Sequence, residues 1–205
     1  MNQQTDISNI LLKYFENFQI SSKNIQLIIS SLQPLTIEKG ENFSVQCKVC
    51  NKIGILVSGL LYAYYFTEDG EQKVSRFFYI PKNDNELMST SVVTSFESFR
   101  HGINSNETIT AIEKSKLYCI SKNDLEKLYD EIPEMNYVGR EIAEHGYIQT
   151  LQRVHSLQAV KNEQRFMKFF KEAPELFPRL KIQHITSYLA MNRNEYSKYM
   201  KKAKR

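Results

Sequence analysis

The segment at residues 52–80 constrains the fold of this chain more than any other part of the sequence. Apolar side chains alternate with their neighbours in two consecutive runs: Ile53, Ile55 and Val57, then Leu60, Tyr62, Tyr64 and Phe66. A turn signal, Glu68-Asp69-Gly70, follows, and an aromatic-rich run then leads to Pro81. Alternation with a period of two around a short glycine turn is typical of a β-hairpin. The chain is therefore expected to contain an antiparallel sheet.

From Ser121 onward the apolar residues follow helical spacing instead. Pro133 can begin a long helix, and its apolar stripe consists of Met135, Val138, Ile142, Ile148, Leu151 and Val154. Short helices are also expected before the strands, at residues 8–18 and after a cap at Ser21 or Ser22. Strands and helices that are segregated along a chain predict an α+β fold or two domains.

The long helix has no partner of equal length in the rest of the sequence. A helix with an unmatched apolar stripe commonly packs against a second copy of itself. We therefore predict a homodimer with parallel helices at residues 133–157. The alternative is a helix that lies across the strands of its own chain.

The composition is that of an ordinary globular protein. A chain of 205 residues with 41% hydrophobic and 24% charged residues can bury a core, which excludes a disordered chain or a fibrous repeat. No apolar run is long enough to cross a membrane, and the first ten residues lack the features of a signal peptide. We predict a cytoplasmic protein with no membrane partner.

Residues 182–205 carry the most specific functional signal. A helix-turn-helix needs an apolar first helix, a tight turn and a second helix with polar or basic residues on its outer face. Ile182, Ile185 and Leu189 are predicted to face inward. The predicted DNA contacts on the outer face are Arg193, Asn194, Ser197, Lys198, Lys201 and Lys202. The alternative is a basic helix that is merely solvated, because most basic runs have no ligand.

Further motifs make nearly the whole chain resemble the Crp/Fnr family of bacterial transcription regulators. They are Leu56-Val57-Ser58-Gly59-Leu60-Leu61, Asn162-Glu163-Gln164-Arg165-Phe166, Pro174-Glu175-Leu176 and Ile185-Thr186-Ser187-Tyr188-Leu189. The resemblance implies a jelly-roll sensor domain of the cyclic-nucleotide-binding type at residues 1–132 and a dimerisation helix at 133–157. It implies a winged-helix-type helix-turn-helix domain at residues 158–205.

The same resemblance gives roles to single residues. It implies that Arg193, Asn194 and Lys198 read base pairs. It also places Ala190 at a turn position that the family usually fills with glycine. A left-handed backbone at an alanine costs about 1 kcal/mol, which a stable domain tolerates.

The effector pocket is where the sequence departs from the family. The resemblance implies a pocket formed by Glu86, Leu87, Ser105, Asn106 and Thr150. Relatives that bind cyclic AMP have an arginine for the cyclic phosphate where this chain has Ser105. A buried phosphodiester without a cation loses its charge-assisted hydrogen bonds. We therefore expect weak binding of cyclic AMP or none, with Arg100 as the alternative source of the missing charge.

The remaining reactive residues do not form a recognisable site. Some family relatives sense oxygen with an iron–sulfur cluster, which takes four thiolates, but this chain has only Cys47, Cys50 and Cys119. We expect reduced thiols and no cluster. The four histidines lack the spacing of a metal cupin enzyme, and neither a nucleophile elbow nor a glycine-rich phosphate loop is found. We predict that the chain has no cofactor and is not an enzyme.

These observations lead to two hypotheses. The first is a homodimeric transcription regulator that binds double-stranded DNA, contacts RNA polymerase and has a degenerate effector pocket. The second is a jelly-roll protein that binds a small molecule and uses its C-terminal helices only for assembly. The basic outer face after Arg193 favours the first, because assembly alone does not require it.

Overall fold

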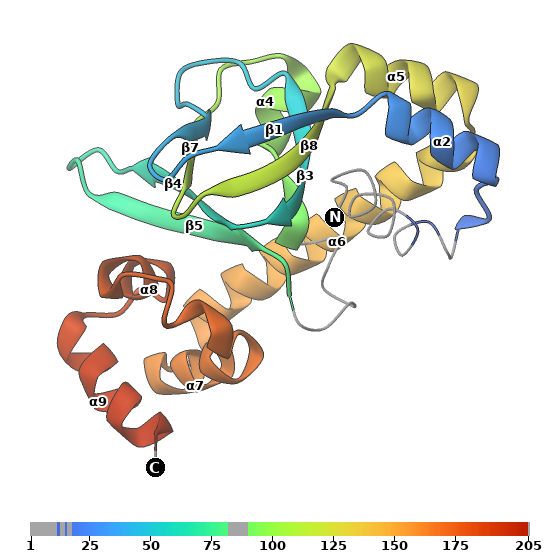
Figure 1. The fold of residues 1–205 in the computed structure, drawn as a ribbon. Coiled ribbons are helices and arrows are strands. Elements are labelled where there is room, and N and C mark those ends of the chain that lie inside the picture. The colour runs from blue at the N-terminus through green and yellow to red at the C-terminus, as the bar shows by residue number, and fades with distance from the viewer. Residues whose placement is uncertain (1–11, 13–14, 16–17, 82–89, 205) are drawn as a thin grey trace.

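The computed structural model describes residues 12, 15, 18–81 and 90–204 (Figure 1). Most of the helix expected at residues 8–18 and the effector positions Glu86 and Leu87 lie outside the described residues. The described chain forms a β domain, one long helix and a group of C-terminal helices, in the order that the sequence predicts.

The β domain consists of two four-stranded antiparallel sheets. Sheet A has the strand order β1 (Gln33–Ile37), β8 (Ser115–Ser121), β3 (Lys52–Ser58) and β6 (Val92–Val93). Sheet B has the order β2 (Asn42–Ser44), β7 (Thr108–Ala111), β4 (Leu60–Phe66) and β5 (Gln72–Tyr79). One apolar core with Leu56, Leu61 and Ile109 at its centre joins the two sheets. The expected α+β fold with a jelly-roll domain is confirmed.

The hairpin predicted from alternation is formed by β4 and β5, in which Leu60 pairs with Tyr79 and Phe66 with Gln72. The sequence at residues 92–99 is also compatible with a short helix, but only its second half is helical. Val92 and Val93 instead pair with β3, and the helix α4 starts later, at Phe96–His101. β-branched valines fit the edge of a sheet better than the first turn of a helix.

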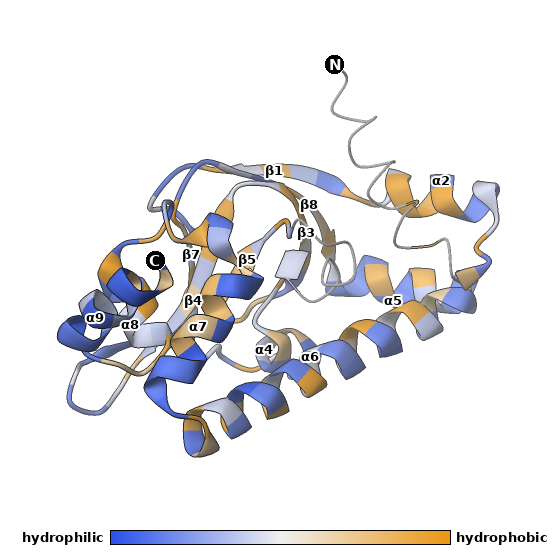
Figure 2. Cartoon of the chain, turned by 90° about the horizontal axis from the view of Figure 1, so that it is seen from below, coloured by the Kyte–Doolittle hydropathy of each residue, from blue (hydrophilic) through white to orange (hydrophobic). Residues whose placement is uncertain are grey.

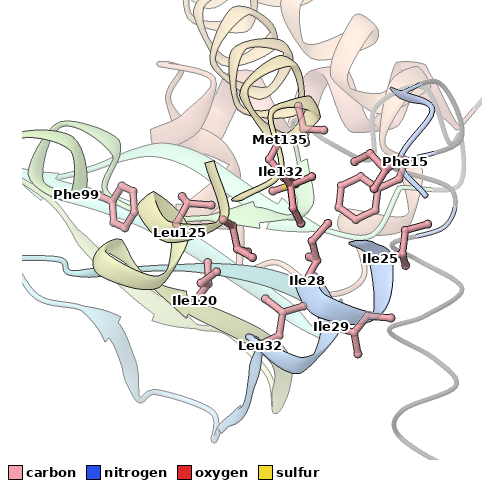
Figure 3. Close-up of a cluster of buried hydrophobic side chains, with 13 residues drawn as sticks. Phe15, Ile25, Ile28, Ile29, Leu32, Phe99, Ile120, Leu125, Ile132 and Met135 are labelled. Atoms are coloured by element: carbon pink, nitrogen blue, oxygen red, sulfur yellow. The ribbon is translucent and has the colours of Figure 1, made fainter. Parts of the chain in front are cut away.

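Three helices cover sheet A: α2 (Ser22–Ser30), α5 (Lys122–Glu131) and the first turns of α6 (Glu134–Ala159). The Ser21 side chain caps α2 by accepting from the backbone N–H of Asn24, as the sequence predicts. Together with Phe99 and Ile120 these helices form an apolar cluster (Figure 3), called the N-terminal cluster below.

Four short elements follow the long helix: α7 (Asn162–Glu172), the 3₁₀ turn η3 (Pro174–Leu176), α8 (Ile182–Tyr188) and α9 (Arg193–Ala203). They pack around Phe166, which is fully buried. The same cluster includes Leu60, Val74 and Phe77 from sheet B. We call it the C-terminal cluster, and it joins the C-terminal helices to the β domain.

The helix α6 runs diagonally below the β domain in Figure 1 and connects the two clusters. Within α6 only Met135 and Val138 are buried. Its later apolar residues are exposed and alternate with hydrophilic ones (Figure 2): Tyr147, Ile148, Leu151, Val154 and Leu157. No helix in the described part of the chain is both long and apolar enough to span a bilayer.

Candidate nucleic-acid interface

The two helices α8 and α9 meet at a tight turn. Ala190 has a φ of 47°, the left-handed backbone that the sequence predicts there. The amide of Met191 donates to the Thr186 carbonyl at 3.0 Å and closes the turn. A capping box then starts α9, since Asn192 and Glu195 each accept a hydrogen bond from the other's backbone N–H. The arrangement is that of a helix-turn-helix.

The inner face of this unit largely agrees with the prediction. Ile185 and Leu189 are buried, and Tyr199 contributes from α9. The inward orientation of Ile182 is wrong, because this side chain is 36% exposed. Ile182 is the first residue of α8 and lies beyond the end of the buried face. Two residues later, His184 is buried instead and its ring lies 4.7 Å from that of Tyr62.

The outer face of α9 brings the predicted DNA contacts together. All six are exposed: Arg193, Asn194, Ser197, Lys198, Lys201 and Lys202. All of them except Arg193 line one shallow depression. Within the part of the chain that the structure describes, Arg193, Lys198 and Lys201 have no acidic side chain within ion-pair distance. The face therefore has positive charge that the protein does not neutralise.

The acids near α9 are held away from this face. Glu195 accepts from the Asn192 backbone N–H at 3.0 Å and from Asn162 Nδ2 at 2.9 Å. These two hydrogen bonds, the first being the stronger cause, hold the pKa of Glu195 below its usual range, so it is ionised but turned toward α7. Glu163 of α7 forms an ion pair with Lys202. Lys202 is thus a predicted DNA contact whose charge is already paired with a carboxylate of the protein.

Arg165 ties the C-terminal helices to α6. Its guanidinium is buried and donates to the Ser156 carbonyl at 2.8 Å, to the Val160 carbonyl at 2.9 Å and to the Leu189 carbonyl at 2.8 Å. These carbonyls lie at the C-terminal ends of α6 and α8, where helical hydrogen bonds run out. One side chain therefore caps two helices and sets their relative position.

A second contact links the unit to the edge of sheet B. The hydroxyl of Ser187 accepts from the Val74 N–H at 2.9 Å and lies 3.2 Å from the Gln72 carbonyl. Arg153 of α6 donates to the carbonyls of Val74 (3.2 Å) and Tyr188 (2.9 Å). Because β5 is an edge strand, its outward backbone groups need such partners. The helix-turn-helix is held against the β domain by specific hydrogen bonds as well as by apolar packing.

Three of the predicted effector residues, Ser105, Asn106 and Thr150, lie in the described part of the chain, and each forms hydrogen bonds within the protein. Ser105 is buried, and its hydroxyl bonds to the Ser95 hydroxyl at 2.8 Å and to the Glu107 carbonyl at 2.7 Å. Asn106 is exposed, and the hydroxyl of Thr150 bonds within its own helix to the Gly146 carbonyl. None of these three lines the large cavity described below.

Sequence reasoning missed a cation that Glu107 connects to Ser105. Arg76 of β5 forms an ion pair with Glu107 and donates to the Thr94 carbonyl at 3.0 Å. Ser75 donates to the same carboxylate at 3.2 Å. The sequence feature that could have indicated this contact is the position of Arg76 next to the aromatic residues of β5. An acid of the chain itself already neutralises this guanidinium.

The cysteines do not form a site in the described residues. Cys50 and Cys119 are buried, Cys47 is exposed, and all three are free thiols. Burial raises the pKa of Cys119 to about 11, which keeps this thiol protonated and poorly nucleophilic at neutral pH. Among residues 18–81 and 90–204, no group of three or more His, Cys, Asp or Glu side chains could hold a metal ion.

Comparison with known proteins was informative only at the level of structure. No family model matches the sequence, and no curated protein matches it. A double variant of CooA from Carboxydothermus hydrogenoformans matches 95% of this chain and 84% of its own, with a TM-score of 0.66 and 13% identity. The c-di-GMP-responsive global regulator CLP of Xanthomonas campestris matches 90% of this chain and 92% of its own, with a TM-score of 0.65 and 12% sequence identity.

A third structure names the family. A protein from Eubacterium rectale, described as a transcriptional regulator of the Crp/Fnr family, matches 91% of this chain and 84% of its own, with a TM-score of 0.61 and 16% identity. The chain has the Crp/Fnr fold. Since these matches extend over nine tenths of the chain, they include the β domain, α6 and the C-terminal helices alike. The Crp/Fnr resemblance predicted from short motifs is thus confirmed by the three-dimensional arrangement.

Proposed function

We propose that this protein is a homodimeric transcription regulator that binds specific sequences in double-stranded DNA. The observation that carries the proposal is the outer face of α9, where three unpaired cations and Asn194 are exposed on the second helix of a helix-turn-helix. Such a helix fits the major groove, where Arg and Lys recognise guanine and Asn recognises adenine. Structural similarity to proteins described as regulators supports the same function.

Within this interface the residues have two roles. Arg193, Asn194 and Lys198 lie in the first turns of α9 and are proposed to contact base edges. Ser197, Lys201 and Lys202 are proposed to contact phosphates, together with the exposed Lys204. Lys202 must give up or share its ion pair with Glu163 to do so.

The dimer is proposed to form through α6. Tyr147, Ile148, Leu151 and Val154 are between 45% and 65% exposed, which is unusual for large apolar side chains along one helix. A second α6 packed in parallel would cover them. We assign residues 1–132 to the sensor domain, 133–157 to dimerisation and 158–205 to DNA binding. RNA polymerase is the proposed protein partner, and the cytoplasm the proposed location.

The sensor domain is proposed to be a degenerate cyclic-nucleotide domain without cofactor or enzymatic activity. Glu107 forms an ion pair with the Arg76 guanidinium. The Ser105 hydroxyl is buried and forms hydrogen bonds with Ser95 and with the Glu107 carbonyl. A cyclic phosphate would have to displace a carboxylate that is already in place. Calorimetric titration with cyclic AMP and cyclic GMP should therefore show no binding at micromolar concentrations. Micromolar affinity would overturn this part of the proposal.

The DNA proposal is tested by comparing two variants on selected and random duplexes. Arg193→Ala should cost about 1–3 kcal/mol per half-site on the selected sequence and relax discrimination at one base pair. Lys201→Ala should weaken binding to both duplexes equally and reduce the salt dependence. Lys39→Ala, on an exposed turn of the β domain, is the matched control and should change neither.

Two outcomes of this experiment would overturn parts of the proposal. Equal weakening by Arg193→Ala on both duplexes would make Arg193 a phosphate contact and overturn its base-reading role. No effect from either variant would overturn DNA binding through α9. The jelly-roll protein with C-terminal helices for assembly would then be the better hypothesis.

A further inference from the structure

A cavity of about 530 Å³, which none of Ser105, Asn106 and Thr150 lines, lies between sheet A and the helices that cover it. Apolar side chains from α2, α4, β8, α5 and α6 line it, and Figure 3 shows several of them: Ile28, Leu32, Phe99, Ile120, Leu125 and Met135. Pockets that bind small molecules have volumes of about 300–1,000 Å³ and mostly apolar walls. The N-terminal cluster is thus a core with enough room for a ligand.

The polar side chains of this cavity include three cations, two of which have partners. Lys122 donates to the Arg100 carbonyl at 2.9 Å, and Arg140 lies 3.7 Å from the Glu144 carboxylate. The Arg100 guanidinium has no hydrogen-bond or ion-pair partner among the residues that the structure describes. Arg100, considered from the sequence as a possible phosphate ligand, therefore lines this cavity instead.

On α4, the charged side chain of Arg100 lies beside the apolar ring of Phe96. Phe96 is four residues earlier on α4, so the two side chains share one face of that helix. Phe96 is 47% exposed and also lines the cavity. An exposed aromatic ring beside an unpaired guanidinium suits a ligand that has an apolar body and an anionic end.

Tyr129 shows how closely α5 and α6 approach beside this cavity. A Cβ atom at Gly139 of α6 would lie 2.4 Å from the Tyr129 hydroxyl, so only glycine leaves room for the ring. Burial raises the pKa of Tyr129, and the charge of Arg100 acts in the opposite direction. The tyrosine is therefore a neutral hydrogen-bond donor near Arg100 at neutral pH.

We propose that this cavity binds an alkyl monocarboxylate, with the chain against the apolar wall and the carboxylate on Arg100. Two acids, Glu126 and Asp130, also line the cavity and would favour a cationic head group. Arg100 outweighs them because it shares one face of α4 with the half-exposed ring of Phe96, which also lines the cavity. The first turns of α6 form part of the wall, so an occupied cavity would act on the same helix that is proposed to dimerise.

The first test is calorimetric titration of the full chain with decanoate, dodecanoate and tetradecanoate, below the concentrations at which they form micelles. Saturable binding of one molecule per chain is expected. Each added methylene should tighten the Kd about fourfold until the cavity is full. Binding that is not saturable, or that does not depend on chain length, would overturn the proposal.

The second test separates Arg100 from its neighbours. Arg100→Gln should weaken dodecanoate about tenfold or more and leave dodecanol unchanged, since a charge-assisted hydrogen bond is lost only with the acid. Arg140→Gln is the matched control, because Arg140 already has Glu144 as its partner, and should have little effect. Equal losses in both variants would overturn the role of Arg100.

A third arm tests the apolar wall and the charge of the ligand. Val92→Phe, at a half-buried lining position, should weaken every chain length by filling the cavity. Tighter binding of a dodecyl ammonium than of dodecanoate would assign the site to Glu126 and Asp130 and overturn the proposal. No DNA is present in these titrations, so their failure leaves the proposed DNA function intact, and the reverse also holds.

Discussion

The two apolar clusters that lie outside the core between the sheets differ in how completely they are packed. The C-terminal cluster is filled by aromatic rings, with Phe166 within 6.2 Å of Phe170, Phe177, Tyr196 and Tyr199. The N-terminal cluster has a comparable set of buried side chains but surrounds a cavity of about 530 Å³. Close packing suits a region that must hold a recognition helix in one orientation, and a hollow core suits a region that admits a ligand.

The clusters differ in polar contacts as well. Around the C-terminal cluster, Arg165, Arg153 and Ser187 connect α6, α8 and β5 through backbone carbonyls and amides. Arg179 adds an ion pair with Glu113 and a 2.8 Å bond to the Gly59 carbonyl. These hydrogen bonds, buried for Arg165–Leu189 and half-buried for the others, favour one arrangement, because any other leaves polar groups without partners. The C-terminal helices and the β domain should therefore unfold as one unit.

The largest effect is expected for Phe166→Ala. This change removes the ring at the centre of the closed cluster and should lower the free energy of unfolding by about 3–5 kcal/mol. Phe99→Ala, which enlarges an existing cavity, should cost less, because that ring already has fewer neighbours on one side. Urea denaturation of both variants measures the difference. Equal losses of unfolding free energy in the two variants would mean that the N-terminal cluster is as closely packed in solution as the C-terminal cluster, which would contradict the difference between them.

Arg165→Met should have the next largest effect, a loss of about 2–4 kcal/mol. The methionine keeps the apolar stem but removes the guanidinium donor from three carbonyls, of which that of Leu189 is buried and those of Ser156 and Val160 are half-buried. Thermal unfolding followed by circular dichroism measures the loss. Lys168→Met on the exposed side of α7 is the control and should be nearly neutral. A neutral Arg165→Met would show that water replaces the guanidinium, and the two helix ends would then be less fixed than the structure indicates.

Ser187→Ala should lower stability by about 1 kcal/mol, because the Val74 amide loses its acceptor. Limited proteolysis should then cut faster near residues 159–161, which connect α6 to α7, as the C-terminal helices detach from β5. Thr186→Ala is the matched control, since that hydroxyl is exposed and bonds only to the Gln183 carbonyl. If both variants are cut at the same rate, Ser187 does not hold the unit in place.

The smallest effect is a pH dependence from His184, which lies on α8 and packs against the ring of Tyr62. Burial, followed by the charge of Lys181, lowers the pKa of His184 below its ordinary value of 6.5. The unfolded chain then binds the proton more readily, so stability is complete above pH 6.5 and falls below it. The loss at about pH 6 should be under about 1 kcal/mol. His184→Phe should reduce this slope, and an unchanged slope would assign it to other groups.

Several elements could be predicted from local sequence. The β4–β5 hairpin follows from alternation and its glycine turn, and the cap at Ser21 from a hydroxyl before a helical run. The left-handed Ala190 follows from the Crp/Fnr resemblance, which places it at a turn position that the family usually fills with glycine. These features depend on residues a few positions apart, whose geometry the chain itself dictates. The exposed positions of Arg193 and Lys198 follow in the same way from the period of one helix.

Tertiary structure alone decided the contacts between distant segments. The sequence, by its short-range patterns, determined a β domain, a long helix and a helix-turn-helix with a basic outer face. It did not indicate that Glu107 neutralises Arg76, that His184 is buried while Ile182 is exposed, or that Arg100 lines a cavity. Each of these depends on which surfaces meet when the elements pack. A periodic pattern records which face of an element is apolar, but the partner of that face is chosen only when the whole chain closes around its cores.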